Sequence, residues 1–276
     1  MIKKWHLASI VGAIALTCTQ SALAHRTWLL PSMGVADDKG AWVTFDAAVS
    51  EDLFVFGANA VKLEGLSIQA PDGSSLPAQN ASTGRLRSSF DLQLSQEGTY
   101  RVSLVNESAM ASYKLGTEVK RWRGAVDAIA KEVPKDAQEL RVTITQARLE
   151  TFVTAGRGSE GALRPAGKGL EVLPVTHPEH YAPGDVARFR ALLDGKPLTG
   201  LTVAVVPGGV RYRGVLREQA FTTDAKGEFS VKWPEAGMYA INASYPPRPT
   251  QPPAAEPGET TTRRFTYTST LEVLPQ

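Results

Sequence analysis

Apolar and polar residues alternate with a period of two through most of the chain after residue 40. Side chains of a β-strand point alternately to the two faces of its sheet, so this alternation predicts strands with one buried face. Gly-containing turns such as Pro71-Asp72-Gly73 and Pro183-Gly184-Asp185 separate the alternating segments. Short strands with turns at this spacing predict β-sandwich architecture. The segments lie at 41–49, 66–70, 89–94, 99–105, 140–145, 187–193, 202–206, 228–233, 238–243 and 265–273.

One segment has helical instead of extended spacing. Residues 125–133 carry apolar side chains three or four positions apart, and Pro134 follows directly. Proline disfavours helical conformation in the residue before it, so the helix is expected to end there. The sequence therefore predicts a mostly β fold with one short helix, near 125–133, between two groups of strands.

The two groups of strands repeat each other weakly. The segment 94–104, LSQEGTYRVSL, is similar to 233–243, WPEAGMYAINA, and in both a Gly turn opens a strand with an inward aromatic residue. Two sandwiches of related plan explain such a repeat. We predict domains at 25–160 and 168–276, with the boundary in the Gly-rich run between them. The second domain resembles immunoglobulin-like or transthyretin-like modules.

The first 24 residues have the organisation of a cleaved secretory signal peptide. Lys3 and Lys4 precede an apolar stretch at 7–16, and the segment ends with the small-x-small pattern Ala22-Leu23-Ala24. The apolar stretch is shorter than the roughly 20 residues that span a bilayer. We therefore expect a periplasmic protein without stable membrane insertion.

A lipoprotein acylated at Cys18 is the competing interpretation of this segment. Ala15 and Thr17 do not match the large aliphatic and small residues that a lipobox requires at those positions. Cleavage after Ala24 is the better fit.

Charge and cysteine content exclude several function classes. The chain has 30 Lys and Arg against 28 Asp and Glu, and the signal peptide removes two of the lysines. The mature chain then has equal numbers of positive and negative side chains. We therefore do not expect it to attract nucleic acid through a strong electrostatic field. Its only cysteine, Cys18, leaves with the signal, which excludes disulfides and a thiol nucleophile. With no nucleophile elbow, phosphate loop or nameable acid–base pair, we do not expect an enzyme.

The three histidines of the mature chain fall in two places. Cleavage after Ala24 gives His25 a free α-amine beside its imidazole, and the two can chelate one ion. His177-Pro178-Glu179-His180 places two imidazoles and a carboxylate on one loop. Nitrogen ligands suit later transition metals, so we predict a nickel, cobalt or copper site formed by His25, His177, His180 and Glu179. This prediction assumes that the two places meet in the fold. The alternative is that both are solvated polar segments.

Several segments resemble an exported family called domain of unknown function 4198. They are 24–32 (AHRTWLLPS), 45–54 (FDAAVSEDLF), 169–178 (GLEVLPVTHP) and the Pro-Gly-Asp and Asp-Gly-Lys-Pro-Leu pair that follows. Members of that family are often described as the periplasmic component of a cobalt or nickel transport system. The resemblance implies metal uptake or handling, with a membrane transporter or outer-membrane receptor as partner. His25 and His177 match the family pattern, whereas the family often has Asn or Asp at positions 179 and 180.

Two functions follow from these observations. The first is a periplasmic protein that binds a divalent transition metal for uptake or handling. The second is a metal-free exported binding or adhesion module of tandem immunoglobulin-like domains. Arg121-Trp122-Arg123 and Arg211-Tyr212-Arg213 also interleave arginine with aromatic residues. That pattern suits either anion or sugar binding, or arginine stacked on a surface ring.

Overall fold

The computed structural model describes residues 26–247 and 260–276, and the fold is that of these ranges. Strands make up 55% and helices 7% of the described residues, which confirms the prediction of a mostly β protein. The predicted signal peptide lies outside the described residues. No helix in the described ranges is long and apolar enough to span a bilayer.

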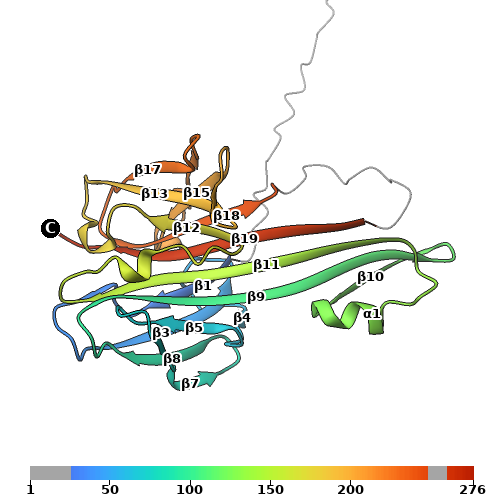
Figure 1. Ribbon diagram of the computed structural model, residues 1–276, viewed down its shortest axis with the longest axis horizontal. Helices are drawn as coiled ribbons and strands as arrows, with labels where there is room; N and C mark the ends of the chain where they lie inside the picture. The colour runs from blue at the N-terminus through green and yellow to red at the C-terminus, as the bar shows by residue number, and fades with distance from the viewer. Residues whose placement is uncertain (1–25, 248–259) are drawn as a thin grey trace, which may run out of the picture.

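A five-stranded sheet forms one outer layer of the molecule, at the bottom of Figure 1. Its order is β1-β3-β8-β7, and β4 pairs with β3. The strands are β1 (Arg26–Pro31), β3 (Trp42–Ser50), β4 (Asn59–Ala60), β7 (Gln79–Thr83) and β8 (Ser88–Gln93).

A ten-stranded sheet runs through the middle of the molecule in the order β16-β15-β18-β19-β11-β9-β5-β6. β10 pairs with β9, and β2 pairs with β11. The strands are β2 (Val35–Ala36), β5 (Leu66–Gln69), β6 (Ser75–Leu76), β9 (Gly98–Leu115), β10 (Glu118–Gly124), β11 (Gln138–Ala155), β15 (Thr202–Pro207), β16 (Gln219–Thr222), β18 (Gly237–Tyr245) and β19 (Thr260–Val273).

A four-stranded sheet forms the other outer layer. β13 (Val186–Leu193) pairs with β12 (Leu170–Pro174), β14 (Lys196–Pro197) and β17 (Glu228–Lys232). The short helices are α1 (Ile129–Glu132) and α2 (Val210–Arg213), and the 3-10 turns are η1 (Val126–Ala128), η2 (Gly161–Leu163) and η3 (Pro178–His180).

Two apolar cores follow from the alternation of the strands. The five-stranded sheet packs on the β5–β9–β11 part of the central sheet, where the rings of Phe45 and Phe90 stack with centroids 4.9 Å apart. The four-stranded sheet packs on the β15–β18–β19 part, around Phe189, Trp233 and Tyr239. The predicted two sandwiches are therefore present, each with one outer sheet of its own.

The two sandwiches share their central sheet, which the sequence did not predict. β11 and β19 pair in parallel from Arg141↔Thr260 to Thr151↔Thr270. This ladder joins a strand of the first sandwich to a strand of the second, so the sheet continues across both. Strands of the first sandwich end at Ala155, and those of the second begin at Leu170. The proposed domain limits at 160 and 168 stay a prediction, because the shared sheet makes the halves structurally dependent.

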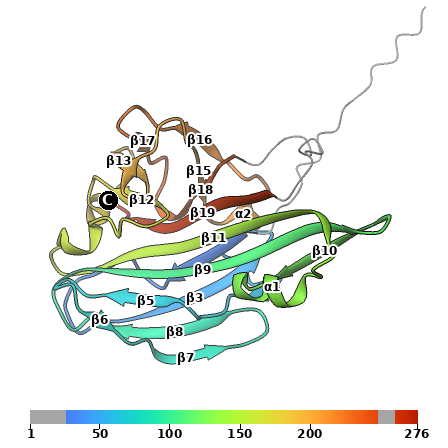
Figure 2. The same ribbon diagram turned by 45° about the vertical axis from the view of Figure 1, so that its right-hand side comes forward.

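The predicted helix near 125–133 is present as η1 followed by α1, but it does not lie between the sandwiches. It packs at the far end of a long arm made by β9, β10 and β11 (Figures 1 and 2). Its position there is explained by a separate small cluster in which Ile129 and Val133 contact Tyr113 and Val142. The short α2 was not predicted from the sequence.

Candidate functional site

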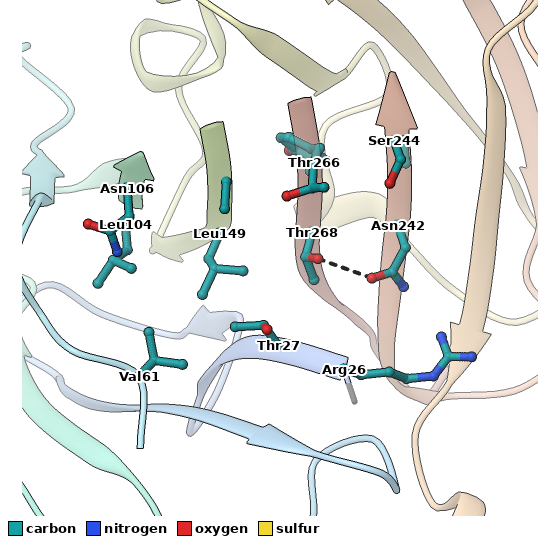
Figure 3. A pocket seen from close by; sticks show the side chains of 13 residues that line it. Arg26, Thr27, Val61, Leu104, Asn106, Leu149, Asn242, Ser244, Thr266 and Thr268 are labelled. Carbon is teal, nitrogen blue, oxygen red and sulfur yellow. Dashed lines mark hydrogen bonds between the residues drawn. The ribbon is translucent and has the colours of Figure 1, made fainter. Parts of the chain in front are cut away.

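A cavity of about 360 Å³ lies at the seam where the central sheet passes from one sandwich to the other. Figure 3 shows its side chains projecting from neighbouring strands of the central sheet, with β1 along one side. We call it the seam cavity. Its lining consists of Arg26, Thr27, Val61, Leu104, Asn106, Ala147, Leu149, Asn242, Ala243, Ser244, Thr266, Tyr267 and Thr268.

Strand register explains why these residues converge. Ala147 pairs with Asn106 on one side and with Thr266 on the other, and Thr266 pairs with Ser244. Directly paired residues point to the same face of a sheet, so these four side chains form one row. Leu104, Leu149, Thr268 and Asn242 form the next row in the same way. Two adjacent rows therefore present mainly amide and hydroxyl groups on the second-sandwich side and apolar groups on the first.

The lining combines polar and apolar groups and has little uncompensated charge. The Thr268 hydroxyl donates to Asn242 Oδ1 at 3.1 Å. Arg26 Nη2 donates to Glu218 Oε2 at 3.1 Å, which compensates the guanidinium charge at the cavity. Such a site offers hydrogen bonds to a ligand without selecting strongly for a charge.

A network of buried charges occupies the other face of the same strands. Arg101 Nε donates to Glu150 Oε1 at 2.6 Å, and its Nη2 donates to Glu171 Oε1 at 2.8 Å. Arg101 is 5% exposed, and both glutamates are fully buried. Because Arg101 and Glu150 belong to the first sandwich and Glu171 to the second, this network connects the two.

Three further side chains complete the network around Glu150, and the first is Ser103, whose hydroxyl donates to Glu150 Oε1 at 2.8 Å. Arg148 Nη1 donates to Glu150 Oε1 at 3.4 Å, and the Tyr267 hydroxyl donates to Glu150 Oε2 at 2.9 Å. Burial by itself would raise the pKa of Glu150, but the charges of Arg101 and Arg148 outweigh burial and lower it. Burial raises the pKa of Tyr267 well above its ordinary value. The network therefore holds an ionised Glu150 beside a neutral phenol.

The predicted loop residues His177, Glu179 and His180 do come together, on the 3-10 turn η3. Glu179 Oε1 lies 3.5 Å from His177 Nδ1 and 3.4 Å from His180 Nε2. Pro178 occupies the first position of the turn, where its fixed φ suits the geometry. His180 is exposed, with 68% of its side chain accessible, whereas His177 is 8% exposed.

Both ring nitrogens of His177 already have partners. Nδ1 accepts from the Glu179 backbone N–H at 3.3 Å, and Nε2 lies 2.9 Å from Thr99 Oγ1. The tautomer with the proton on Nε2 satisfies both contacts, since the Thr99 hydroxyl can then donate to Thr154 Oγ1, 3.1 Å away. His177 thus ties η3 to β9 and β11, and a metal would have to displace one of these bonds. Within residues 26–247 and 260–276, no three His, Cys, Asp or Glu side chains are grouped to hold a metal ion.

The fourth predicted ligand, His25, lies outside the described residues. Its neighbour Arg26 borders the seam cavity beside Ala147. His177 instead bonds Thr99, which pairs directly with Thr154. Ala147 and Thr154 belong to one strand and are about 23 Å apart at the usual rise of about 3.3 Å per residue. A metal site shared by His25 and the His177 loop stays a prediction, and the described residues give it no support.

Sequence reasoning missed the seam cavity and the buried charge network. Asn106, Thr268 and Asn242 are far apart in the sequence and look like ordinary outward residues of three strands. Arg101 and Glu150 likewise sit at polar positions of alternating strands. The one available signal was an excess of Thr, Ser and Asn at the outward positions of the last two strands.

Comparisons with known proteins bear on the family more than on the fold. The model of a family described as Domain of unknown function (DUF4198) matches residues 22–246. No curated protein matches the chain. Among solved structures, the D0-D1 domain of intimin is 12% identical, with 89% of this chain and 97% of that chain covered and a TM-score of 0.23. The human OSCAR ligand-binding domain is 14% identical, with 90% and 99% covered and a TM-score of 0.22. TM-scores this low carry no argument about ligand or partner.

Proposed function

This chain belongs to the family described as Domain of unknown function (DUF4198), and on that premise we propose that it is an exported binding module. Its ligand would be a small, polar, uncharged molecule held in the seam cavity. The observation that carries this proposal is the convergence of amide and hydroxyl side chains from both sandwiches on one cavity. The metal-free alternative from the sequence is thus the function that the geometry favours.

Size and charge of the cavity indicate the class of ligand. Its volume of about 360 Å³ is at the lower end of the range of roughly 300–1,000 Å³ found for small-molecule sites. The pairing of Arg26 with Glu218 leaves no free cation among the described residues that line the cavity, so an anion is not specifically recognised there. Asn242, Thr266 and Thr268 offer both donors and acceptors, a combination that matches the hydroxyl groups of a monosaccharide or polyol.

Filling the cavity tests the proposal. Calorimetric titration with glucose, galactose and mannitol is expected to show binding of at least one probe to the wild type. Ala147→Phe places a ring between Asn106 and Thr266 and should abolish that binding. Ala81→Phe, on the exposed edge strand β7, makes the same change away from the cavity and should leave it intact. Absence of binding to all three probes, or equal loss in both variants, contradicts the proposal.

Transition-metal binding is the second candidate, favoured by the position of Glu179 between two imidazoles. A divalent nickel, cobalt or copper ion could be held there if it displaced the bonds of His177. The family resemblance and the predicted chelating terminus at His25 also support this candidate. A membrane transporter or outer-membrane receptor would then be the partner that receives the ion.

The metal could bind on the His177–His180 loop or at the N-terminal chelate of His25. Titration of the mature protein and its variants with Ni²⁺, Co²⁺ and Cu²⁺ distinguishes these two sites. His180→Ala should weaken a site built on the loop, whereas His25→Ala, or one residue added before His25, should weaken a terminal chelate. Wild-type affinity in all three variants contradicts metal binding at either place.

A further inference from the structure

The arm formed by β9, β10, β11 and the start of β19 carries a basic face on the side opposite α1. The arm extends beyond the two sandwiches (Figures 1 and 2). On one face, Trp122 and Val142 both pair with Ala111 and pack with α1, and Trp122 Nε1 donates to Glu132 at 2.8 Å. Trp122 therefore points away from the two arginines that flank it, and neither arginine stacks on its ring.

Register places the basic residues on the opposite face. Arg123 pairs with Met110, Arg121 pairs with Ser112, and Val119 pairs with Lys114. Successive residues of a strand alternate between faces, so these side chains all lie opposite Ala111 and Trp122. Arg264 lies on the same face. It pairs with Thr145, and Thr145 pairs in turn with Ser108 on β9.

This basic face is open in the described part of the chain. Met110 is 53% exposed and Val119 is 62% exposed. Arg121 and Arg123 are exposed and form no ion pair with another described residue. Lys114 is compensated by Glu139 at 2.6 Å, and Arg264 donates to the Pro247 carbonyl at 3.3 Å. The face therefore keeps a concentrated positive charge although the whole chain has a net charge of only +2.

Hydroxyl side chains fill the spaces between the cations. Ser108, Ser112, Thr143, Thr145 and Thr262 lie on the same face, by the same register. The row Ser108–Thr145–Arg264 directly follows the row of Asn106, Ala147 and Thr266 at the seam cavity. From Asn106 to Lys114 the strip is about 27 Å long at about 3.4 Å per residue.

We propose that this basic face binds an extended anionic polysaccharide. Guanidinium groups hold carboxylate or sulfate groups in a bidentate manner, and the hydroxyls between them suit the sugar hydroxyls of the same chain. An anionic membrane surface fits less well. Among the described residues of this face, Met110 and Val119 are the exposed large apolar side chains, and interfacial binding needs a larger apolar face. The proposal goes beyond the ligand of the seam cavity and does not depend on it.

Dextran sulfate is the probe for this proposal, with neutral dextran as its uncharged counterpart. The wild-type protein should bind dextran sulfate in a salt-dependent manner and should not bind dextran. The double variant Arg121→Gln/Arg123→Gln should lose about tenfold or more in affinity, as expected for two charge-assisted hydrogen bonds. Lys131→Gln/Lys135→Gln makes the same charge change on the α1 side and should bind like the wild type.

Several outcomes overturn the proposal. One is equal loss of affinity in both double variants, which would indicate a response to net charge alone. Others are no binding to dextran sulfate, or binding only to phosphatidylglycerol vesicles. Far-UV circular dichroism checks that the exposed substitutions leave the fold intact. Ala147→Phe should retain dextran sulfate binding, so failure at the seam cavity and failure at the basic face are distinguishable.

Discussion

Arg101 on β9 and Glu171 on β12 form an ion pair across the junction of the two sandwiches, with Nη2 and Oε1 2.8 Å apart. Glu171 also accepts hydrogen bonds from the backbone N–H groups of Ala166 and Gly167. One carboxylate thus binds an arginine of the first sandwich and the segment that leads into the second. This buried contact helps to set the orientation of the two sandwiches. The shape of the seam cavity depends on that orientation.

Removing the arginine of this pair should destabilise the whole protein. Arg101→Met leaves Glu150 and Glu171 buried with one cation fewer, and the expected cost is about 3–5 kcal/mol in the free energy of unfolding. Urea denaturation followed by circular dichroism measures it. Arg190→Met breaks an ion pair with Glu228 at the surface and should cost less than about 1 kcal/mol. Equal effects of the two substitutions would show that the buried network does not hold the seam.

Acid should weaken the protein through Glu150. Its pKa is lowered in the folded state, so the stabilisation is complete above the ordinary unfolded value of 4.5. It is lost progressively as the pH falls through the lower folded value, because the unfolded chain then takes up the proton first. The free energy of unfolding should therefore decline below a pH of 4.5 in the wild type. Glu150→Gln should reduce this slope, and an unchanged slope would contradict the assignment.

The two loop histidines should differ sharply in their effect on stability. His177→Ala removes a buried ring that bonds Thr99 and the Glu179 backbone, at an expected cost of about 1–3 kcal/mol. His180→Ala changes an exposed side chain and should cost less than about 0.5 kcal/mol. Thermal unfolding in the presence of a chelator measures both without any metal contribution. If His177→Ala is as harmless as His180→Ala, the structural role of His177 is wrong.

A methyl group at Gly158 should disturb the same loop from the other side. A Cβ there would lie 2.2 Å from His177 Cε1 and 2.7 Å from Glu179 Oε2, so the ring would have to move. Gly158→Ala should therefore destabilise the protein by about 1–3 kcal/mol, the usual cost of overpacking. Gly57→Ala is the matched control, because a Cβ at Gly57 meets nothing within 4 Å. Equal unfolding midpoints of the two variants would contradict the tight packing of His177.

Local sequence pattern located ten of the strands and the contents of the His177 loop. It missed β1, β7, β10 and β16, and it gave only parts of the long strands β9 and β11. Tyr100 and Tyr239, aligned by the internal repeat, are both buried at the start of corresponding strands. The pattern also located the helix before Pro134. These features depend on neighbours within a few residues, and side-chain alternation or proline geometry reports such neighbours directly.

The sequence by itself determined a β-rich chain with two sandwiches and a loop at 177–180 that carries two imidazoles. Only the tertiary structure decided that β11 and β19 pair in parallel, that Arg101 and Glu150 are buried, and that Asn106 and Asn242 face one cavity. The physical reason is that an outward position of a strand is exposed or buried according to what covers that face. The cover here comes from residues far away in the sequence, such as Glu171, which is 70 positions from Arg101. Neither periodicity nor composition specifies such a contact.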